Sequence, residues 1–574
     1  MSDQQPPFGP PPYGPPSGPP SGPPPGPPPG SSPEYASFGG GGQRGPRNTR
    51  KWLIGTGAVV AAAALVGGGA FAAASLLGGD DPTPADALPA STFAYAGVDL
   101  SKAGGAISLL KKFPGLADDA DLGDLGDGTD LGQKLVTSML DDAGDVCDGL
   151  SWEKDFAPWL GHQAAVAGVD VSGDPVPVAV VASTDDDKAK DELTKLKDCS
   201  SGKLAGEVTD GWVVVSKDQA SLDKVVDATD SAKLSDDDTY SDWMDKVGDP
   251  GALTAYAAPD AGEMASKALD EYSGLLGELS DGTLDDDYGT DYYGDSQGPD
   301  ALMGEACPGL EDGKGAIASL KSSLESFQGA AATLRFEDDG VELEAASDLG
   351  KTSGASDEAG DLVGGLPDDT AVALGISVDG DWFDQLISSI GSMCGDGFDA
   401  GSIEDQLSQQ TGLAIPDDIN TLLGDGLTLA VGSDFDPDNV SGPEDLPFGL
   451  KIKGDPDGIK SVIEKIRDSI GTSDEGFLDS DSDGDMIAIG PSSTYRKSLL
   501  DDGGLSSTAA FKDVVPDADK ATAVLFIDFD AFDSVVEKDG SADDVANYKP
   551  LKALGLSSTY DGTTVHSFLR LSTD

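Results

Sequence analysis

One run of alternating aspartates has the spacing of a metal site: residues 479–484 read DSDSDG. In a calcium loop such carboxylates converge on one ion, and the glycine allows the chain to turn sharply. The twelfth position of that loop is a bidentate glutamate, but here it is Gly490. Because the loop is incomplete, we favour an acidic hairpin turn with no cofactor, and a calcium ion bound by Asp479, Asp481 and Asp483 is the alternative interpretation.

Cysteines are the second group of reactive side chains. The chain contains Cys147, Cys199, Cys307 and Cys394, and no CxxC pair that would indicate a zinc or thioredoxin-type site. An even number of cysteines in an oxidising compartment predicts two disulfides, for which three connectivities are open. We favour Cys147–Cys199 with Cys307–Cys394.

Catalytic motifs are not recognisable in this sequence. The only two histidines are His162 and His566, and no GxSxG sequence supplies a nucleophile for a Ser-His-Asp hydrolase. With 104 acidic residues, a carboxylate pair can be found almost anywhere, so no pair is singled out. A GxxxxGK[ST] phosphate-binding loop is also missing. We therefore assign no catalytic and no nucleotide-binding residue.

Charge restricts the partners of the chain. The formal net charge is −68, and only two acidic residues precede residue 80, so nearly all of the negative charge falls after it. Self-repulsion on this scale favours solubility and argues against nucleic acid and anionic lipid as partners.

The 25 residues from 53 to 77 carry no charge. As a helix they would extend about 37 Å, which is enough to cross a bilayer. Basic residues precede this segment and two aspartates follow it, so residues 52–78 are predicted to be a single transmembrane helix in the cell membrane, with the N-terminus cytoplasmic and the rest extracytoplasmic. A cleaved signal peptide is the alternative, although a 51-residue segment before the apolar run is far too long for one.

Residues 1–51 are rich in proline and glycine and cannot bury enough apolar surface to fold. Residues 14–29 repeat glycine every fourth position, which is typical of an extended polyproline-like arm. We predict a disordered cytoplasmic tail that acts as a spacer, with docking onto a cytoplasmic partner as the alternative.

The residues after the membrane segment contain two versions of one sequence pattern. Each version opens on an LPxxT sequence, at Leu88 or Leu366, and ends on a hairpin with an Asp-Gly turn, at residues 339–340 or 561–562. Between these ends the order of expected elements is the same: strands at 164–169 and 427–431, strands at 177–182 and 447–452, helices at 188–197 and 458–467, strands at 212–215 and 486–489, and strands at 252–257 and 523–528.

This pattern predicts an α+β fold of two tandem related halves, with mainly antiparallel sheets and packed helices. The first half covers residues 88–347 and the second covers 366–574. Linkers are expected at 79–87 and 348–365, and acidic inserts at 118–130 and 278–312.

The tail, the Ala-rich membrane segment, the LPxxT openings and the LGHQA sequence at residues 160–164 together resemble an actinobacterial family of membrane-anchored envelope proteins, catalogued as domain of unknown function 3352. The resemblance implies membrane anchorage. It implies no reaction and no catalytic residue.

Three functional hypotheses follow. The preferred one is a non-catalytic binding or structural module of the cell envelope, whose partner is a protein or an envelope ligand; it predicts an apolar groove or a flat interface. The second is an extracytoplasmic hydrolase, which predicts a cleft between the halves lined by carboxylates of perturbed pKa. The third is a calcium-stabilised surface protein, which predicts a large rise in melting temperature with calcium.

Overall fold

The computed structural model describes residues 82–102, 104–113, 133, 151–199, 204–267, 324–348, 358–378, 380, 382–384, 386–388, 400–435, 440–470 and 476–574. The proline-rich tail, the membrane segment at 52–78 and both acidic inserts lie outside these ranges and stay predictions. No helix within the described ranges is long and apolar enough to cross a membrane.

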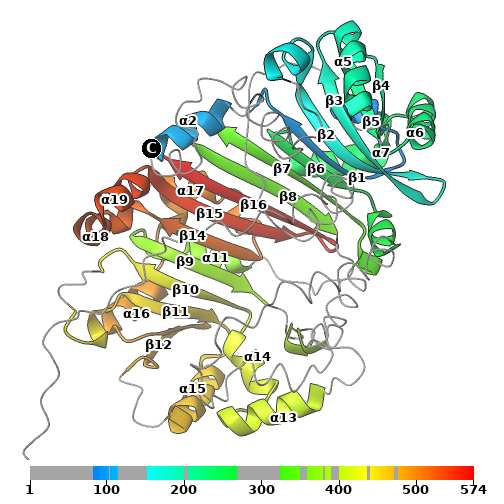
Figure 1. Ribbon diagram of the computed structural model, residues 1–574. Coiled ribbons are helices and arrows are strands. Elements are labelled where there is room, and N and C mark those ends of the chain that lie inside the picture. The colour runs from blue at the N-terminus through cyan, green and yellow to red at the C-terminus, as the bar shows by residue number, and fades with distance from the viewer. Residues whose placement is uncertain are drawn as a thin grey trace, which may run out of the picture. The chain divides into compact units, whose positions relative to one another are not determined.

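The fold is α+β, as predicted, and is built on one large antiparallel sheet (Figure 1). Its strands in chain order are β1 (Thr92–Asp99), β2 (Leu160–Val171), β3 (Asp174–Ser183), β4 (Ala205–Thr209), β5 (Trp212–Ser216), β6 (Leu253–Ala257), β7 (Gly329–Glu337), β8 (Gly340–Asp348), β9 (Thr370–Ser377), β10 (Gly426–Gly432), β11 (Phe448–Lys453), β12 (Ser480–Asp483), β13 (Met486–Ile489), β14 (Ala523–Asp528), β15 (Leu551–Tyr560) and β16 (Thr564–Thr573).

Strands β1–β8, which we call the first strand group, lie in the order β4-β5-β3-β2-β1-β6-β7-β8. Strands β9–β16, the second strand group, lie in the order β12-β13-β11-β10-β9-β14-β15-β16. Each strand therefore has a counterpart at the same place in the other group. The groups meet where β8 pairs with β16, and we call this boundary the junction; there Leu343 lies opposite Leu569.

The helices are α2 (Gly104–Lys112), α5 (Asp186–Cys199), α6 (Gln219–Ser231), α7 (Asp238–Met244), α11 (Glu358–Gly364), α13 (Ala400–Thr411), α14 (Asp417–Leu423), α15 (Pro456–Ile470), α16 (Ser493–Leu500), α17 (Ala509–Val514), α18 (Asp533–Asp539) and α19 (Ala542–Tyr548). Short helical turns are η2 (Pro84–Ala87), η4 (Trp152–Phe156), η5 (Leu234–Asp236), η6 (Asp245–Val247), η7 (Pro443–Asp445), η9 (Leu505–Ser507), η10 (Ala518–Lys520) and η11 (Asp530–Phe532).

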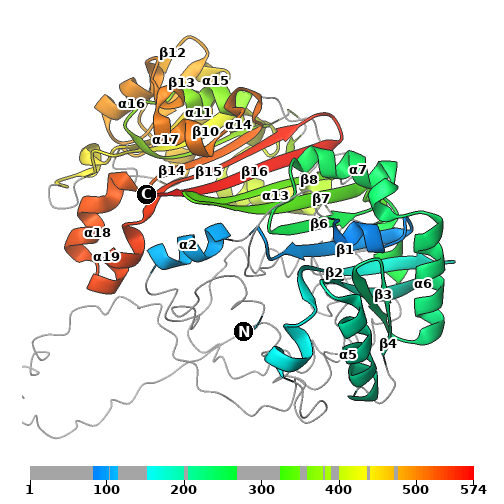
Figure 2. The same cartoon turned by 90° about the horizontal axis from the view of Figure 1, so that it is seen from above.

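Side chains alternate between the two faces of a strand, and the helices use one face far more than the other. On the helix-covered face, α6 and α7 pack over the first strand group, and α11, α16 and α17 pack over the second. Figure 2 shows α7 and α17 on this side of the sheet, with α2 and α5 on the other. The buried centre of the second group is the edge-to-face pair of Phe511 on α17 and Phe526 on β14.

On the opposite face of the sheet, which we call the open face, the helices of the described residues include α5 and α15 over the outer strands and the short helix α2 at the end of β7. Leu193 of α5 packs on Val213 of β5, and Ile459 of α15 packs on Ile452 of β11. Over the middle strands of the second group, the open face exposes Leu374 by 44 %. A sheet with one solvated face normally alternates apolar and polar residues, so an apolar open face calls for a functional explanation.

The predicted hairpin between β7 and β8 is confirmed, but its turn lies at residues 338–339, one position earlier than expected. Glu337 pairs with Gly340, which is already the first residue of β8. A side chain at Gly340 would collide with the carbonyl oxygen of Leu571 on β16. This glycine therefore serves the close approach of the neighbouring strand rather than the turn.

Candidate functional site

Seven alanines share the open face of the four strands β1, β6, β7 and β8. They alternate along their strands with residues that point to the helix-covered face. They are Ala94 and Ala96 of β1, Ala255 and Ala257 of β6, Ala330 and Ala332 of β7, and Ala345 of β8.

Antiparallel pairing gathers these alanines into two rows that run across the strands. In one row Ala96 lies opposite Ala255, which lies opposite Ala332, which lies opposite Ala345. The other row is formed in the same way and consists of Ala94, Ala257, Ala330 and Ser347. Because directly opposed residues are neighbours on the surface, the rows form one continuous apolar floor.

This floor is the bottom of a hollow of about 280 Å³, which we call the alanine hollow. The described residues of its lining are alanines, Val166, Phe327, Ser347, and two tyrosines, Tyr95 and Tyr256, which alternate with the floor alanines along β1 and β6. An engineered apolar cavity of about 150 Å³ binds benzene, and ligand pockets usually measure about 300–1,000 Å³. The alanine hollow therefore has the size and the chemistry of a site for a small apolar group.

At the same places in the second strand group, the open face carries large aliphatic side chains, which we call the leucine face. They are Val372 and Leu374 of β9, Leu525 and Ile527 of β14, Leu554 and Leu556 of β15, and Leu569 and Leu571 of β16. The row that corresponds to Ala96, Ala255, Ala332 and Ala345 is Leu374, Leu525, Leu556 and Leu569. Longer side chains fill the space that the alanines leave empty.

Three tyrosines stiffen the sheet beneath the alanine hollow, on its helix-covered face. Tyr240 of α7 packs edge to face against Tyr95 at 6.2 Å and against Tyr256 at 5.0 Å between ring centroids. Burial raises the pKa of Tyr240 to about 12 and also raises the pKa of Tyr95 and Tyr256. These phenols stay neutral at physiological pH, so they act as apolar packing under the floor.

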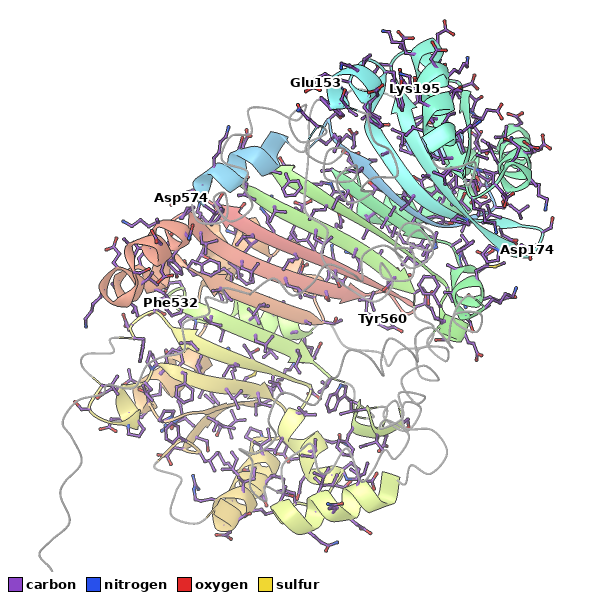
Figure 3. The ribbon with its side chains drawn as sticks, in the orientation of Figure 1. Glu153, Asp174, Lys195, Phe532, Tyr560 and Asp574 are labelled. Carbon is purple, nitrogen blue, oxygen red and sulfur yellow. The ribbon has the colours of Figure 1, made fainter. Side chains whose placement is uncertain are left out.

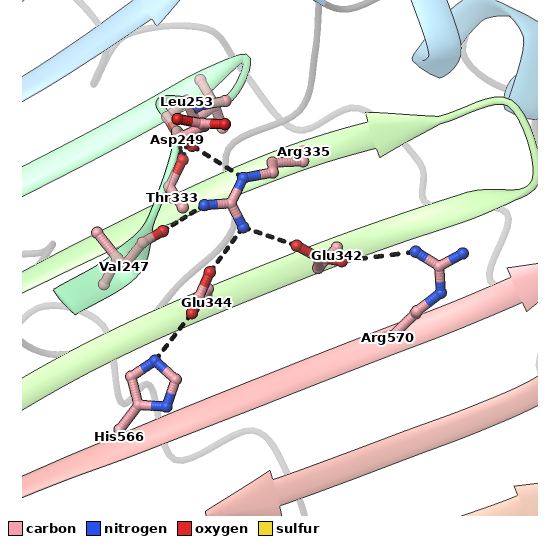
Figure 4. A network of polar contacts seen from close by, with 10 residues as sticks. Val247, Asp249, Leu253, Thr333, Arg335, Glu342, Glu344, His566 and Arg570 are labelled. Carbon is pink, nitrogen blue, oxygen red and sulfur yellow. Dashed lines mark hydrogen bonds and ion pairs between the residues drawn. The ribbon is translucent and has the colours of Figure 1, made fainter. Parts of the chain in front are cut away.

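A network of charged side chains lies at the junction (Figure 4). Arg335 of β7 donates from Nη1 to Glu342 at 2.6 Å and to Glu344 at 2.7 Å, both on β8. It also donates to the backbone oxygens of Asp249, at 2.8 Å, and Val247. These contacts use almost the whole donor capacity of the guanidinium, so Arg335 fixes both carboxylates in place.

The second strand group completes this network from β16. His566 lies 2.9 Å from Glu344, measured from Nε2 to Oε1, and Arg570 lies 3.5 Å from Glu342, measured from Nη1 to Oε2. The hydrogen bond from His566 lowers the pKa of Glu344, and the same bond raises the pKa of His566. The network therefore joins the two strand groups by charge as well as by backbone pairing.

The two histidines considered as catalytic candidates are placed on different strand groups. His566 belongs to this ion-pair network, whereas His162 lies on β2 with an exposed side chain. The structure places carboxylates of raised pKa elsewhere: burial raises the pKa of Asp260, Asp528 and Asp530. None of these residues lines the alanine hollow.

The aspartate run at 479–484 forms part of a hairpin, with Asp481 of β12 opposite Ala488 of β13. Arg496 is buried and donates from Nε to Asp481 at 2.8 Å, and Arg467 lies 3.6 Å from Asp479. The described residues include no group of three or more His, Cys, Asp or Glu arranged to hold a metal ion. The calcium site stays a prediction, and a bound ion would have to compete with Arg496 for its ligand.

Cys147, Cys307 and Cys394 lie outside the described residues. Cys199 is the last residue of α5, and its side chain is not described. The disulfide pairing therefore stays a prediction.

Charged side chains gather around α5 at the far side of the first strand group (Figure 3). Lys195 of α5 lies 3.0 Å from Asp155 of η4 and 2.7 Å from Glu192. The hydrogen bond from the Ser151 backbone to Asp155 lowers the pKa of that carboxyl. This ion-pair group fastens η4 to α5 and contrasts with the alanine hollow, whose described lining residues carry no charge.

Comparison with known proteins gives no relative: no family model, no curated protein and no solved structure matches the chain. The alanine hollow is therefore the candidate site on geometric grounds alone.

Proposed function

We propose that this chain is a single-pass membrane protein of the cell envelope whose extracytoplasmic region is a non-catalytic binding module. The observation that carries the proposal is the alanine hollow, a concave apolar site on an otherwise strongly acidic chain. Apolar surface removed from water contributes about 25 cal/mol per Å² to binding. A site of this kind holds a ligand by burial and needs no reacting group.

Membrane anchorage is part of this proposal. Its support is the uncharged segment at 53–77 with basic residues before it and acidic residues after it. The resemblance to the envelope family catalogued as domain of unknown function 3352 supports the same location. The bilayer is then the first partner of the chain, through residues 52–78.

We also propose that the two strand groups are related halves of one duplicated unit. Their opening sequences make matching local contacts. The hydroxyl of Thr92 donates to the carbonyl oxygen of Pro89 at 2.7 Å, and the hydroxyl of Thr370 donates to that of Pro367 at 2.8 Å. In LPxxT, the threonine thus closes the turn that leads into β1 or β9.

The leucine of each LPxxT sequence accepts a matching backbone hydrogen bond. The backbone N–H of Leu234 donates to the carbonyl oxygen of Leu88 at 2.8 Å, and that of Leu505 donates to Leu366 at 3.0 Å. Both acceptor leucines are fully buried. Together with the identical strand order, these paired contacts support a duplication in which one copy keeps an open hollow and the other fills it.

The hydrolase hypothesis requires a carboxyl of raised pKa in a cleft between the halves. The carboxylates at the junction are Glu342 and Glu344, and both are held by Arg335. A lowered pKa on Glu344 suits a fixed anion better than a proton donor. The binding module is therefore the better supported function.

The test is photolabelling of the full chain in membranes with a compact apolar probe, trifluoromethyl-phenyl-diazirine, followed by peptide mass spectrometry. We expect labelled peptides from β1, β6 and β7 in addition to residues 52–78. Filling the hollow with Ala96→Leu and Ala255→Leu should reduce labelling of these strands at least fivefold, whereas Ala220→Leu, at an exposed position of α6, should not. Equal labelling of the filled and control variants would contradict the proposed site.

A further inference from the structure

The alanine hollow has a definite shape and a definite distance from the predicted membrane segment, and these two properties point to one class of ligand. We propose that it holds one acyl chain of a membrane lipid whose headgroup is zwitterionic or uncharged. This inference rests on the proposed function and adds the identity of the ligand.

The hollow is long and narrow. Its two alanine rows cross β1, β6, β7 and β8, and Val166 extends the floor onto β2. With neighbouring strands about 4.8 Å apart, five strands span about 19 Å, whereas rows two residues apart are separated by about 7 Å. An extended hydrocarbon chain matches these proportions, and a compact ring system does not.

Among the described residues, the walls offer a hydrocarbon chain almost entirely apolar contacts and no charged side chain. Phe327 is buried and belongs to the lining, while Ser347 ends the row of Ala94, Ala257 and Ala330 at β8. A saturated chain has no polar atom that would need a partner, so the lack of charge in the lining costs it nothing. A peptide segment would bring backbone N–H and C=O groups that the side chains of the floor cannot pair.

The predicted membrane segment brings the hollow within reach of lipid. It ends at residue 78, and Ala94 of the floor follows 16 residues later. Even a fully extended chain of this length covers only about 55 Å, and η2 shortens it further. With residues 52–78 in the membrane, the hollow therefore stays within about 55 Å of the bilayer, whose acyl chains are the most concentrated apolar groups within that distance.

Charge selects among lipids. The net charge of −68 repels anionic headgroups, and the long-range repulsion is strongest at low ionic strength. Lipids that carry no net charge avoid this penalty. The same acyl chain should therefore enter the hollow more readily from a phosphatidylcholine than from a phosphatidylglycerol.

The experiment uses the full chain reconstituted in phosphatidylcholine vesicles that contain a small fraction of phosphatidylcholine with a diazirine halfway along one acyl chain. After irradiation, cross-linked peptides are mapped by mass spectrometry. We expect label on β1, β6 and β7 as well as on residues 52–78. Replacing the probe by phosphatidylglycerol with the same labelled chain should lower the label on these strands at least threefold at low salt.

Two double variants test whether the label depends on the hollow. Filling the hollow with Ala255→Leu and Ala332→Leu should reduce label on the first strand group at least fivefold. Opening the corresponding positions with Leu525→Ala and Leu556→Ala should create label on β14 and β15, where the wild type has little. Ala96→Leu is a milder filling variant, and each variant is accepted only if its thermal unfolding resembles that of the wild type.

Label confined to 52–78 in the folded wild type would overturn the acyl-chain inference, and so would label on β1, β6 and β7 that the filling variants leave unchanged. A cross-link between hollow peptides of two copies would also overturn it, because a second copy would then be the occupant. If the compact diazirine probe labels the hollow but the lipid probe does not, the binding module survives and only the ligand class fails. If neither labels it, both proposals fail.

Discussion

The alanine hollow and the leucine face occupy the same place in their strand groups, yet one is concave and the other is filled. Ala255 in the first strand group corresponds in position to Leu525 in the second, and Ala332 corresponds to Leu556. The strand order and the antiparallel pairing do not change, because pairing uses backbone groups. The comparison shows that side-chain length alone can turn one face of a common sheet into a binding site.

The two regions also differ in what they leave exposed. Leu374 and Leu429 of the second group are large apolar side chains in contact with solvent. Contiguous apolar surface of this kind marks interaction sites in soluble domains. The leucine face thus presents exposed apolar side chains next to the alanine hollow, and both lie on the open face.

The largest expected effect tests whether the two faces of one strand really differ in burial. Phe526→Ala should lower the free energy of unfolding by about 3–5 kcal/mol, because it empties a well-packed site on the helix-covered face. Its neighbour Leu525→Ala should cost only about 1 kcal/mol, because Leu525 faces the open side. Chemical denaturation measures both. Equal costs would mean that the open face is covered as tightly as the other.

The next effect concerns the junction that joins the two regions. Arg335→Met should lower the free energy of unfolding by about 2–3 kcal/mol, because it removes the cation shared by two partly buried carboxylates and leaves Glu342 only Arg570 and Glu344 only His566. As a control, Lys520→Met removes an exposed ion pair with Asp517 and should change stability by less than about 0.5 kcal/mol. If both variants unfold alike, Arg335 contributes no more to stability than an exposed ion pair does.

A smaller difference in stability is expected between substitutions at two adjacent alanines of β7. Ala331→Leu should destabilise by about 1–3 kcal/mol, because Ala331 is buried against the helix-covered face and a longer side chain overpacks it. Ala332→Leu should be tolerated within about 0.5 kcal/mol, because its side chain enters the hollow. Thermal unfolding of the two variants compares them directly, and a reversed order would place the hollow on the wrong face.

The smallest effect is a pH dependence of the junction. The raised pKa of His566 contributes stability that is fully present below its ordinary value of 6.5 and is lost as pH rises through the raised value. The lowered pKa of Glu344 contributes stability that is present above its ordinary value of 4.5 and is lost as pH falls through the lowered value. His566→Gln should therefore destabilise most between pH 4.5 and 6.5, by less than about 1 kcal/mol, because the imidazole is 34 % exposed and solvent screens the pair.

The charged groups near the imidazole are Glu344 and Arg335 of the network and Asp517, and the Lys246 backbone also bonds to it. Asp517→Asn should lower the pKa of His566 only slightly, because Asp517 has the smallest effect among the groups that raise this pKa. NMR titration of the imidazole in the wild type and in both variants measures these shifts. An unshifted imidazole pKa in the wild type would remove the basis for the expected pH dependence.

Element identity was largely predictable because hydrophobic periodicity is a local property. The strand expected at 177–182 is β3, the helix expected at 458–467 is α15, and the strand expected at 523–528 is β14. Strand β12 was missed as a strand, because its sequence Ser480–Asp483 has low strand propensity and resembles a calcium loop. Pairing with β13 and the ion pair between Asp481 and Arg496 supply what the local sequence lacks.

Periodicity alone does not predict the candidate site, although the alternating alanines that form it are visible in the sequence. Alanines alternate in the sequences of β1 and β6, and this spacing puts them on one face. Which strands lie side by side, and in which register, depends on contacts between residues far apart in the chain. Only that register gathers Ala96, Ala255 and Ala332 into one row.

By itself, the sequence determined the acidic charge, the order of strands and helices along the chain and the alternation that gives each strand an apolar face, because these depend on composition and on near neighbours. The tertiary structure decided that β8 pairs with β16, that Arg335 and His566 meet on Glu344, and that small side chains lie together in one strand group and large ones in the other. These outcomes require distant segments to share a surface, and surface shape arises only when they do.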